Sequence, residues 1–183
     1  MIKNKYFEDF NLGDKYILPS RTQTSGIFSM FQGVSGDNDP IHYDVEFCKQ
    51  KGHKNMLAHG LQVMSQTAAG AGIFPSEVRQ SLLGMIEISG KFLKPVYKND
   101  TLYPELEIIN LVSQKTTGII EMKATILNQN QKLVFEGIQK LDGKVDQSLQ
   151  NQSQTLKNQT EILQKLEITT SLKNIFCLLY TSP

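Results

Sequence analysis

Hydrophobic and polar residues alternate in strand-like runs over the later part of the first 143 residues. Turn residues such as Lys98–Asp100 and Asn128–Asn130 separate some of these runs. The runs cover approximately residues 82–96, 101–112, 116–127 and 132–141. Because they follow one another without helical patterns between them, they predict an antiparallel sheet. A further strand is plausible over residues 15–24.

Short helices are predicted in the first half of the chain. One runs to about Val34, with Thr24 or Ser25 as its cap, because hydrophobic side chains recur on one face. These side chains belong to Ile27, Met30 and Phe31. Asp44 is a candidate cap for a second short helix, which ends at Gly52.

A longer helix is predicted over Gly60–Phe74, and Pro75 is expected to close it. Residues 68–72 of this helix are consecutive alanines and glycines. Each glycine weakens an exposed helix by roughly 1 kcal/mol, so such a helix is favourable where another element approaches its backbone closely. A sheet curled around a buried helix meets this condition. The alternative is a loop-prone helix end.

A sharp change in composition predicts a domain boundary near Gly143. All 13 glycines lie at or before this residue, and the tail, residues 144–183, is rich in Gln, Asn, Ser and Thr. The tail has a weak heptad seam formed by Leu149, Gln152, Leu156, Gln159 and Leu163. This pattern is typical of either a weak coiled-coil helix or a disordered segment. The final CLLYTSP continues no pattern and resembles translated sequencing-adapter sequence, so a partly non-native tail is one interpretation.

Composition and charge narrow the functional classes. The 183 residues, 39% of them hydrophobic, suit one domain with an appendage. Nineteen basic and eighteen acidic residues give a net charge of +1, which argues against a nucleic-acid partner. We see neither a signal-peptide pattern nor a run of roughly 20 apolar residues, so we expect a cytoplasmic protein with no membrane partner. Cys48 and Cys177 lie far apart in the sequence, and reduced thiols are expected.

The segment Gly33–His42 carries the main candidate chemistry. It places the carboxylate of Asp37 five residues before the imidazole of His42. Pro40 disfavours helical geometry at the preceding residue, so we expect a turn in which the two side chains converge. A histidine exchanges protons near neutral pH, and a neighbouring carboxylate can orient the ring or share a bound water. The alternative is ordinary turn chemistry, with Asp37 as a cap.

Gly60 is a candidate oxyanion donor because it opens the predicted long helix. Backbone N–H groups at a helix N-terminus are unpaired and carry partial positive charge. A glycine has no side chain to block a ligand that approaches such an N–H group. The alternative is a glycine that serves only the turn into the helix.

Neither a metal nor a cofactor is expected from the sequence. The three histidines and Cys48 lack the paired short spacings of a structural zinc site. The segment Gly70–Gly72 is not a dinucleotide-binding fingerprint, because Pro75 occupies the third glycine position and no strand leads into the segment.

The segment Ser35–His42 (SGDNDPIH) resembles the hydratase motif of the MaoC-like dehydratases, the family of (R)-specific enoyl-CoA hydratases. Other fragments within about residues 5–142 are similar to the same family. They are YFEDFNLGD (6–14), LAHG (57–60), FLKPV (92–96) and NDT (99–101). The resemblance implies an α+β hotdog fold, in which an antiparallel sheet wraps around a central helix. One position departs from the pattern: Asp39, commonly Asn in the family, adds negative charge and is a candidate substrate-binding residue.

The resemblance also implies an enzyme that reversibly hydrates an enoyl thioester, of the type that converts trans-2-enoyl-CoA to 3-hydroxyacyl-CoA. Asp37 and His42 would hold the water and handle its protons, and the Gly60 amide would bind the thioester oxygen. The implied partners are an acyl-CoA or acyl-carrier thioester from fatty acid metabolism. Hotdog domains generally pair through their sheets, so a homodimer or a larger homo-oligomer is expected.

Candidate residues for the acyl pocket are hydrophobic side chains near these motifs, which are also good core candidates. They are Phe28, Phe31, Leu61 and Met64. Lys91 and Lys94 are candidates either for contact with CoA phosphates or for a solvated edge. Two other functions stay open. One is a non-catalytic acyl-CoA-binding hotdog module, which acyl-CoA would stabilise without turnover. The other is an acyl-CoA thioesterase, which would release free thiol from saturated acyl-CoA.

Overall fold

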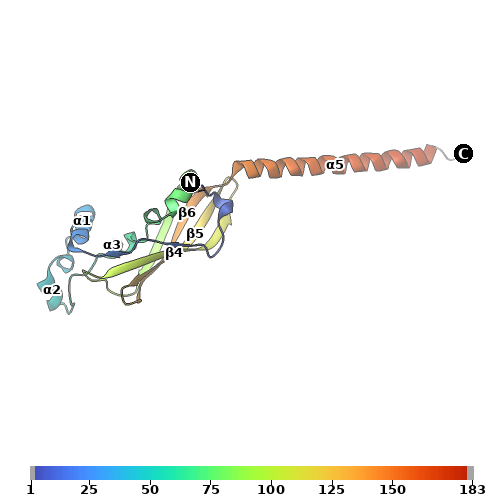
Figure 1. Ribbon diagram of the computed structural model, residues 1–183. Coiled ribbons are helices and arrows are strands. Elements are labelled where there is room, and N and C mark those ends of the chain that lie inside the picture. Colours follow the sequence, from blue (N-terminus) through green and yellow to red (C-terminus); the bar gives the residue numbers. More distant parts are fainter. Residues whose placement is uncertain (1–2, 181–183) are drawn as a thin grey trace. The chain divides into compact units, whose positions relative to one another are not determined.

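A computed structural model describes the backbone of residues 3–180 and the side chains of residues 3–149 and 151–167. The chain divides after Val145 into two compact units, where the composition predicts a boundary near Gly143. The first unit contains a six-stranded antiparallel sheet with short helices, and the second contains one long helix (Figure 1).

The sheet has the strand order β1-β4-β5-β6-β3, and β2 also pairs with β4. The strands are β1 (Lys15–Ile17), β2 (Arg21–Thr22), β3 (Leu82–Phe92), β4 (Thr101–Ser113), β5 (Thr117–Asn128) and β6 (Leu133–Lys144). The last four correspond to the four predicted runs, and every pair is antiparallel. The predicted antiparallel sheet is therefore confirmed.

Prolines account for the two strand predictions that were too long. The single strand predicted over residues 15–24 is divided into β1 and β2, with Pro19 between them. The strand predicted over residues 82–96 ends at Phe92, shortly before Pro95. Proline has no N–H to donate to a neighbouring strand, so the ladder of hydrogen bonds stops near each of these positions.

The two short helices of the first half are confirmed, with their caps. In α1 (Ser25–Ser35), the side chain of Thr24 accepts a hydrogen bond from the N–H of Ile27. In α2 (Val45–Gln50), Asp44 accepts from the backbone N–H groups of the second and third helical residues. Gly36 ends α1 in the left-handed conformation, with φ of 71°, which favours glycine.

The long helix predicted over Gly60–Phe74 is wrong in its second half. The structure has α3 (Gly60–Ser65), the 3-10 helix η3 (Ala69–Ala71) and α4 (Phe74–Glu77). The side-chain amide of Gln139 on β6 donates to both the carbonyl and the hydroxyl of Thr67, at 2.8 and 2.7 Å. This contact takes the Thr67 carbonyl away from a continuing helix. The glycines that follow have a low helix propensity, so they do little to keep the segment helical. Pro75 lies in the first turn of α4 and does not close a helix.

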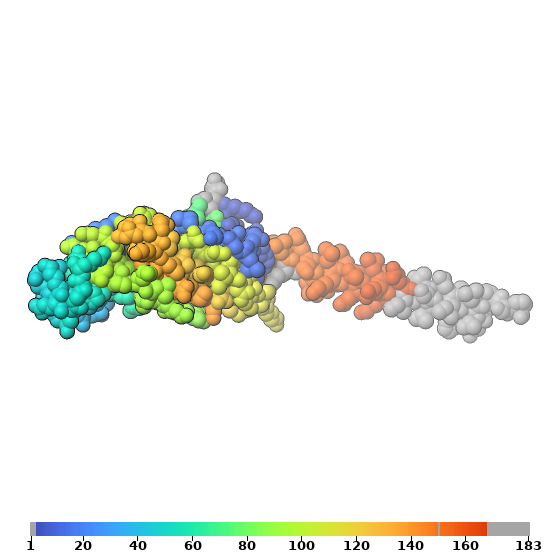
Figure 2. Space-filling model, turned by 90° about the horizontal axis from the view of Figure 1, so that it is seen from below, coloured from blue at the N-terminus to red at the C-terminus, as the bar shows by residue number. Residues whose placement is uncertain are grey.

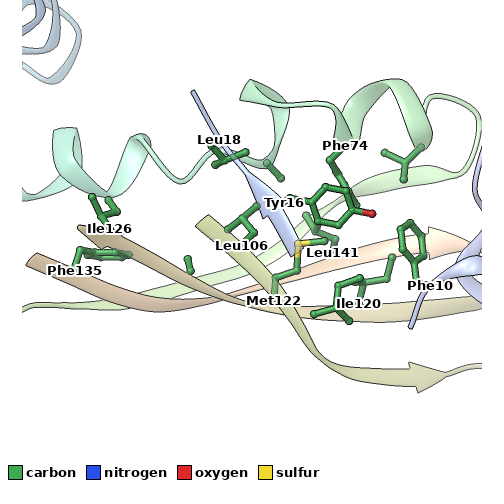
Figure 3. Packing of buried hydrophobic residues seen from close by; sticks show 14 of the residues in the cluster. Phe10, Tyr16, Leu18, Phe74, Leu106, Ile120, Met122, Ile126, Phe135 and Leu141 are labelled. Atoms are coloured by element: carbon green, nitrogen blue, oxygen red, sulfur yellow. The ribbon is translucent and has the colours of Figure 1, made fainter. Parts of the chain in front are cut away.

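The main core lies between the concave face of the sheet and the short helices (Figure 3). Side chains from the central strands pack there against residues from the N-terminal segment and from α4. Members labelled in Figure 3 include Phe10, Tyr16, Leu18, Phe74, Leu106, Ile120, Met122, Ile126, Phe135 and Leu141. Alternate residues of β4 and β5 are buried, which is the pattern of a sheet with one face on the core.

A second, smaller ladder joins residues 56–58 to residues 96–98. Leu57 forms an isolated bridge with Tyr97, the N–H of Ala58 donates to Val96 O, and the N–H of Lys98 donates to Met56 O. Figure 2 shows the cyan segment around residue 50 beside the yellow-green segment around residue 95 at one end of the first unit. The ladder therefore fixes the chain that leads into α3 against the chain that follows β3.

The second unit is the helix α5 (Gln147–Tyr180). The predicted tail is thus helical, and its seam leucines are exposed; Leu156, for example, retains 66% of its accessible surface. Residues 181–183 of the C-terminal CLLYTSP lie outside the described residues, as does the side chain of Cys177. Within the described part of the chain, no helix has both the length and the apolar character that a bilayer crossing requires.

Candidate active site

The candidate acid–base pair lies in the loop between α1 and α2. After Gly36, the carboxylate of Asp37 accepts a hydrogen bond from the N–H of Asp39 at 3.2 Å. The carboxylate of Asp39 then caps the 3-10 helix η2 (Pro40–His42), accepting from the N–H of Ile41 at 3.0 Å. The loop is the turn that Pro40 predicts, because these bonds bend the chain back on itself.

The turn brings the side chains of Asp37 and His42 together. His42 Nε2 lies 3.8 Å from Asp37 Oδ2, and the His42 side chain is 13% exposed against 50% for Asp37. His42 Nδ1 lies 2.8 Å from the carbonyl oxygen of Leu57. A carbonyl only accepts, so Nδ1 carries the hydrogen and the neutral ring presents a lone pair at Nε2.

The 3.8 Å separation is too long for a direct hydrogen bond, and both groups are acceptors. A water molecule has two donors, so it can bond to His42 Nε2 and to the Asp37 carboxylate at the same time. The geometry of the pair thus suits the binding and deprotonation of a water.

His59 is a site residue that the sequence reasoning missed, because it was considered only as a metal ligand. Its ring stacks on that of His42 with centroids 3.6 Å apart and an interplanar angle of 22°. Its Nε2 lies 3.2 Å from the carbonyl oxygen of Asp37, and the residue is 3% exposed. The signal that could have found it is its place next to Gly60 in the LAHG fragment.

Asp37, His42 and His59 each have one atom that could coordinate a metal ion, and these three atoms lie within 4.8 Å of one another. Three of the four imidazole nitrogens, however, already have partners in the protein: Leu57 O, Gln62 Oε1 and Asp37 O. The two rings are also stacked nearly parallel, so their lone pairs do not converge on one point. The arrangement therefore suits acid–base chemistry better than metal binding.

Gly60 opens α3 and contributes to an open pocket of about 380 Å³. The pocket is lined by Leu57, Ala58, Gly60, Val63 and Phe92–Val96. A Cβ atom on Gly60 would lie 3.1 Å from Cζ of Phe92, so the ring closely covers this glycine. Phe92 and Lys94 are pocket residues here, whereas the sequence indicated only a strand and a possible phosphate contact.

None of the predicted substrate-binding residues belongs to the lining of this pocket. Phe28 is buried in a small cluster with Cys48 and Met56, which favours its core role. Phe31 is half-buried, with its ring 5.0 Å from that of His59. Leu61 is 63% exposed, Met64 packs against the main core and Asp39 is occupied as a cap. Of these, Phe31 has a direct contact with the site.

Cys48 is buried beside the loop that carries His42 and does not have the environment of a nucleophile. Its thiol donates to the carbonyl of Ile41, next to His42. Burial raises the pKa of the Cys48 thiol, which disfavours the reactive thiolate.

Comparison with known proteins places these features in context. The model of the family described as "MaoC like domain" matches residues 9–131. A mitochondrial 3-hydroxyacyl-[acyl-carrier-protein] dehydratase of Arabidopsis thaliana is 27% identical over 121 residues, 64% of this chain and 69% of that protein. An (R)-specific enoyl-CoA hydratase of Rhodospirillum rubrum is 27% identical over 136 residues, 72% of this chain and 87% of that protein.

The fold has a solved counterpart in a Mycobacterium tuberculosis protein with a double hotdog fold. The TM-score is 0.63 at 21% identity, over 78% of this chain and 45% of that one. The first unit is accordingly an α+β hotdog domain, as the resemblance of its motifs implies.

Proposed function

Because this chain belongs to the MaoC-like dehydratase domain family, we propose that it catalyses the reversible addition of water to a trans-2-enoyl thioester. The product is a 3-hydroxyacyl thioester. The observation that carries the proposal is the pairing of His42 Nε2, whose ring is fixed through Nδ1, with the Asp37 carboxylate 3.8 Å away. Two acceptors at this spacing bind a water that neither could activate as well alone.

In the proposed reaction, the water oxygen forms a bond to the β-carbon of the conjugated thioester. One proton of the water passes to the Asp37–His42 pair during attack, and electrons of the double bond move toward the thioester oxygen. The pair then returns a proton to the α-carbon, so H and OH are added across the double bond. General acid–base assistance of this kind contributes typically 10²–10⁴-fold to the rate.

The thioester oxygen is proposed to accept from the backbone N–H of Gly60. His59 precedes Gly60 in the chain and stacks on the ring of His42. His59 therefore links the Gly60 N–H group to the proposed base, His42. No side chain caps α3 at His59, which leaves its first N–H groups available to a ligand. Lys94, at the pocket, is suited to the phosphate of a CoA or carrier-protein thioester.

The Gly60→Ala variant is expected to lower kcat/KM by about fivefold, since overpacking at this point costs roughly 1 kcal/mol. The added methyl meets the Phe92 ring and narrows the pocket. Steady-state kinetics on an enoyl-CoA measure the effect, and a second replacement, Phe92→Leu, should restore activity. Gly70→Ala is the matched control, because a Cβ there meets nothing within 4 Å. Equal activities of the Gly60 and Gly70 variants would contradict this placement.

The proposed function is tested directly by the loss of the conjugated-thioester absorbance of crotonyl-CoA and of longer and branched enoyl-CoA analogues. Hydration by the purified chain, with a 3-hydroxyacyl product, supports the proposal. Thermal stabilisation by acyl-CoA with no turnover on the whole panel would indicate a binding module instead. Release of free thiol from saturated acyl-CoA would indicate a thioesterase.

A homodimer is proposed to form through the free edge of β3. This strand is the edge of the sheet and pairs only with β6 among the described strands. Every residue of the strand except Gly84 is exposed, including large apolar side chains. These are Leu82, Leu83, Met85, Ile86, Ile88 and Phe92. A long apolar edge with unpaired backbone groups favours pairing with a second copy of the same strand.

Ile86→Lys is expected to weaken the dimer at least about tenfold, equivalent to roughly 1.4 kcal/mol, because it would bring a charge into the apolar edge. Ile86 is 55% exposed. Analytical ultracentrifugation over a range of protein concentrations gives the dissociation constant. Ile109→Lys, on β4 and 39% exposed, is the control. A wild-type chain that sediments as a monomer would overturn this assignment.

A further inference from the structure

A line of buried polar side chains runs from the segment before α1 to the backbone of Asp37. Its members are Gln23, Gln62 and His59, which are 0, 1 and 3% exposed. Gln62 Nε2 donates to Gln23 Oε1 at 3.0 Å, and Gln62 Oε1 lies 3.1 Å from His59 Nδ1. His59 Nε2 completes the line at 3.2 Å from Asp37 O. Burying three polar side chains is costly unless each is hydrogen-bonded, and here each one is.

We propose that His59 is a positioning residue for the Asp37–His42 pair and that the two buried glutamines hold its ring in place. This inference rests on the proposed function for its kinetic part only. His59 contacts both members of the pair at once: it bonds to the backbone of Asp37 and stacks on His42. His59 is not assigned the role of an acid or a base in the reaction, since both of its ring nitrogens have hydrogen-bond partners within the protein.

The bond to Asp37 matters because residues 36–38 of the loop otherwise form hydrogen bonds only within their own short segment, among the bonds described. Gly36, Asp37 and Asn38 bond with Gln32, Ser35 and Asp39, all in the same short segment. The Asp37 carbonyl receives its bond from a residue 22 positions away. That bond ties the exposed carboxylate-bearing residue to the start of α3, where Gly60 also lies.

The donor roles of the two His59 ring nitrogens follow from the same contacts. The Asp37 carbonyl only accepts, so Nε2 of His59 carries a hydrogen. Gln62 Oε1, which faces Nδ1, also only accepts, so in this arrangement both ring nitrogens donate, while Gln62 Nε2 donates to Gln23 Oε1. A ring with one hydrogen would need the Gln62 amide turned so that its NH2 group donates to Nδ1. A flip of the ring would break both bonds. Residues around the ring include the titratable groups Asp37 and His42 and the apolar ring of Phe31.

The structural part is tested by NMR of the imidazole N–H groups of the full chain, without substrate. We expect a slowly exchanging imidazole N–H that disappears in a His59→Gln variant and is thereby assigned to His59. Gln62→Met, which is similar in size but has no amide, should speed this exchange at least about tenfold, and His53→Met should leave it unchanged. If Gln62→Met does not fold, Gln23→Met removes the next link. A wild-type His59 N–H in fast exchange would overturn the proposal.

The kinetic part compares two replacements of similar size. His59→Met removes the donor to Asp37 and is expected to lower kcat by about 10–100-fold, the scale of a displacement near 1 Å, with KM changed less than about threefold. His59→Gln keeps an N–H at the end of the side chain and should recover several-fold of the lost kcat. Equal kcat values for the two variants would show a packing role and overturn the proposal.

A double-mutant cycle separates positioning from general destabilisation. If His59 acts through Asp37, His59→Met should change the residual rate of an Asp37→Asn protein by less than about twofold. A full additive loss in that background would overturn the assignment. If the wild-type chain hydrates no enoyl thioester, the proposed function fails, while the NMR result still decides whether the glutamines fix His59.

Discussion

Asp37→Asn is expected to lower kcat on an enoyl thioester by about 10²–10⁴-fold, the usual contribution of a general acid or base. Asparagine has nearly the same shape, so the hydrogen bond from the Asp39 N–H can be retained. What is lost is the negative charge, and with it the proton acceptor that faces His42 Nε2 at 3.8 Å. The KM for the thioester should change little, because the proposed mechanism has Asp37 contact the water and not the acyl group.

The measurement is the initial rate of absorbance loss with an enoyl-CoA that the wild-type chain turns over. Asp44→Asn is the matched control: the same chemical change at the cap of α2, where asparagine is an equally good cap. The control should keep wild-type kcat, and thermal unfolding should show that both variants are folded. An Asp37→Asn protein as active as the control would remove the basis of the proposed mechanism.

His42→Ala is expected to have an effect of the same size, a loss of about 10²–10⁴-fold in kcat. The substitution removes the Nε2 lone pair and leaves the Leu57 carbonyl without its donor. Because the proposed mechanism has the two groups handle one water together, the double variant Asp37→Asn, His42→Ala should be little slower than either single variant.

His53→Ala is the control for this experiment, since His53 contacts Tyr97 and takes no part in the pair. It should retain wild-type turnover. A multiplicative loss in the double variant would mean that Asp37 and His42 act in separate steps. Normal turnover in the His42→Ala protein would contradict the assignment of the base.

The long strands and the capped helices were predictable because their signals are local. Alternation identifies β4 and β5, and Asp44 marks the start of α2, wherever the rest of the chain lies. The failure over Gly60–Phe74 has a tertiary cause. Gln139, 72 residues from Thr67 in sequence, takes the carbonyl that a longer helix needs. No pattern within the helical segment contains that information.

The residues of the candidate site likewise fall into those with a local sequence signal and those placed by tertiary contacts. The convergence of Asp37 and His42 follows from a turn of six residues with Pro40 inside it, so the sequence alone predicts it. The roles of His59 and Phe92 depend on contacts across 17 and 32 residues, with His42 and Gly60 respectively. Such contacts exist only once the sheet and α3 are placed, which explains why neither residue was identified as part of the site.

Leu57 links the candidate base, His42, to the wall of the pocket next to Gly60. Its carbonyl holds His42 Nδ1, while its neighbours Met56 and Ala58 bond to Lys98 and Val96 beside the pocket. A bulky acyl group that pushes this wall outward would therefore also rotate the imidazole away from the water. Discrimination between thioesters would then show as slower turnover rather than weaker affinity, and poor substrates would act as competitive inhibitors of good ones.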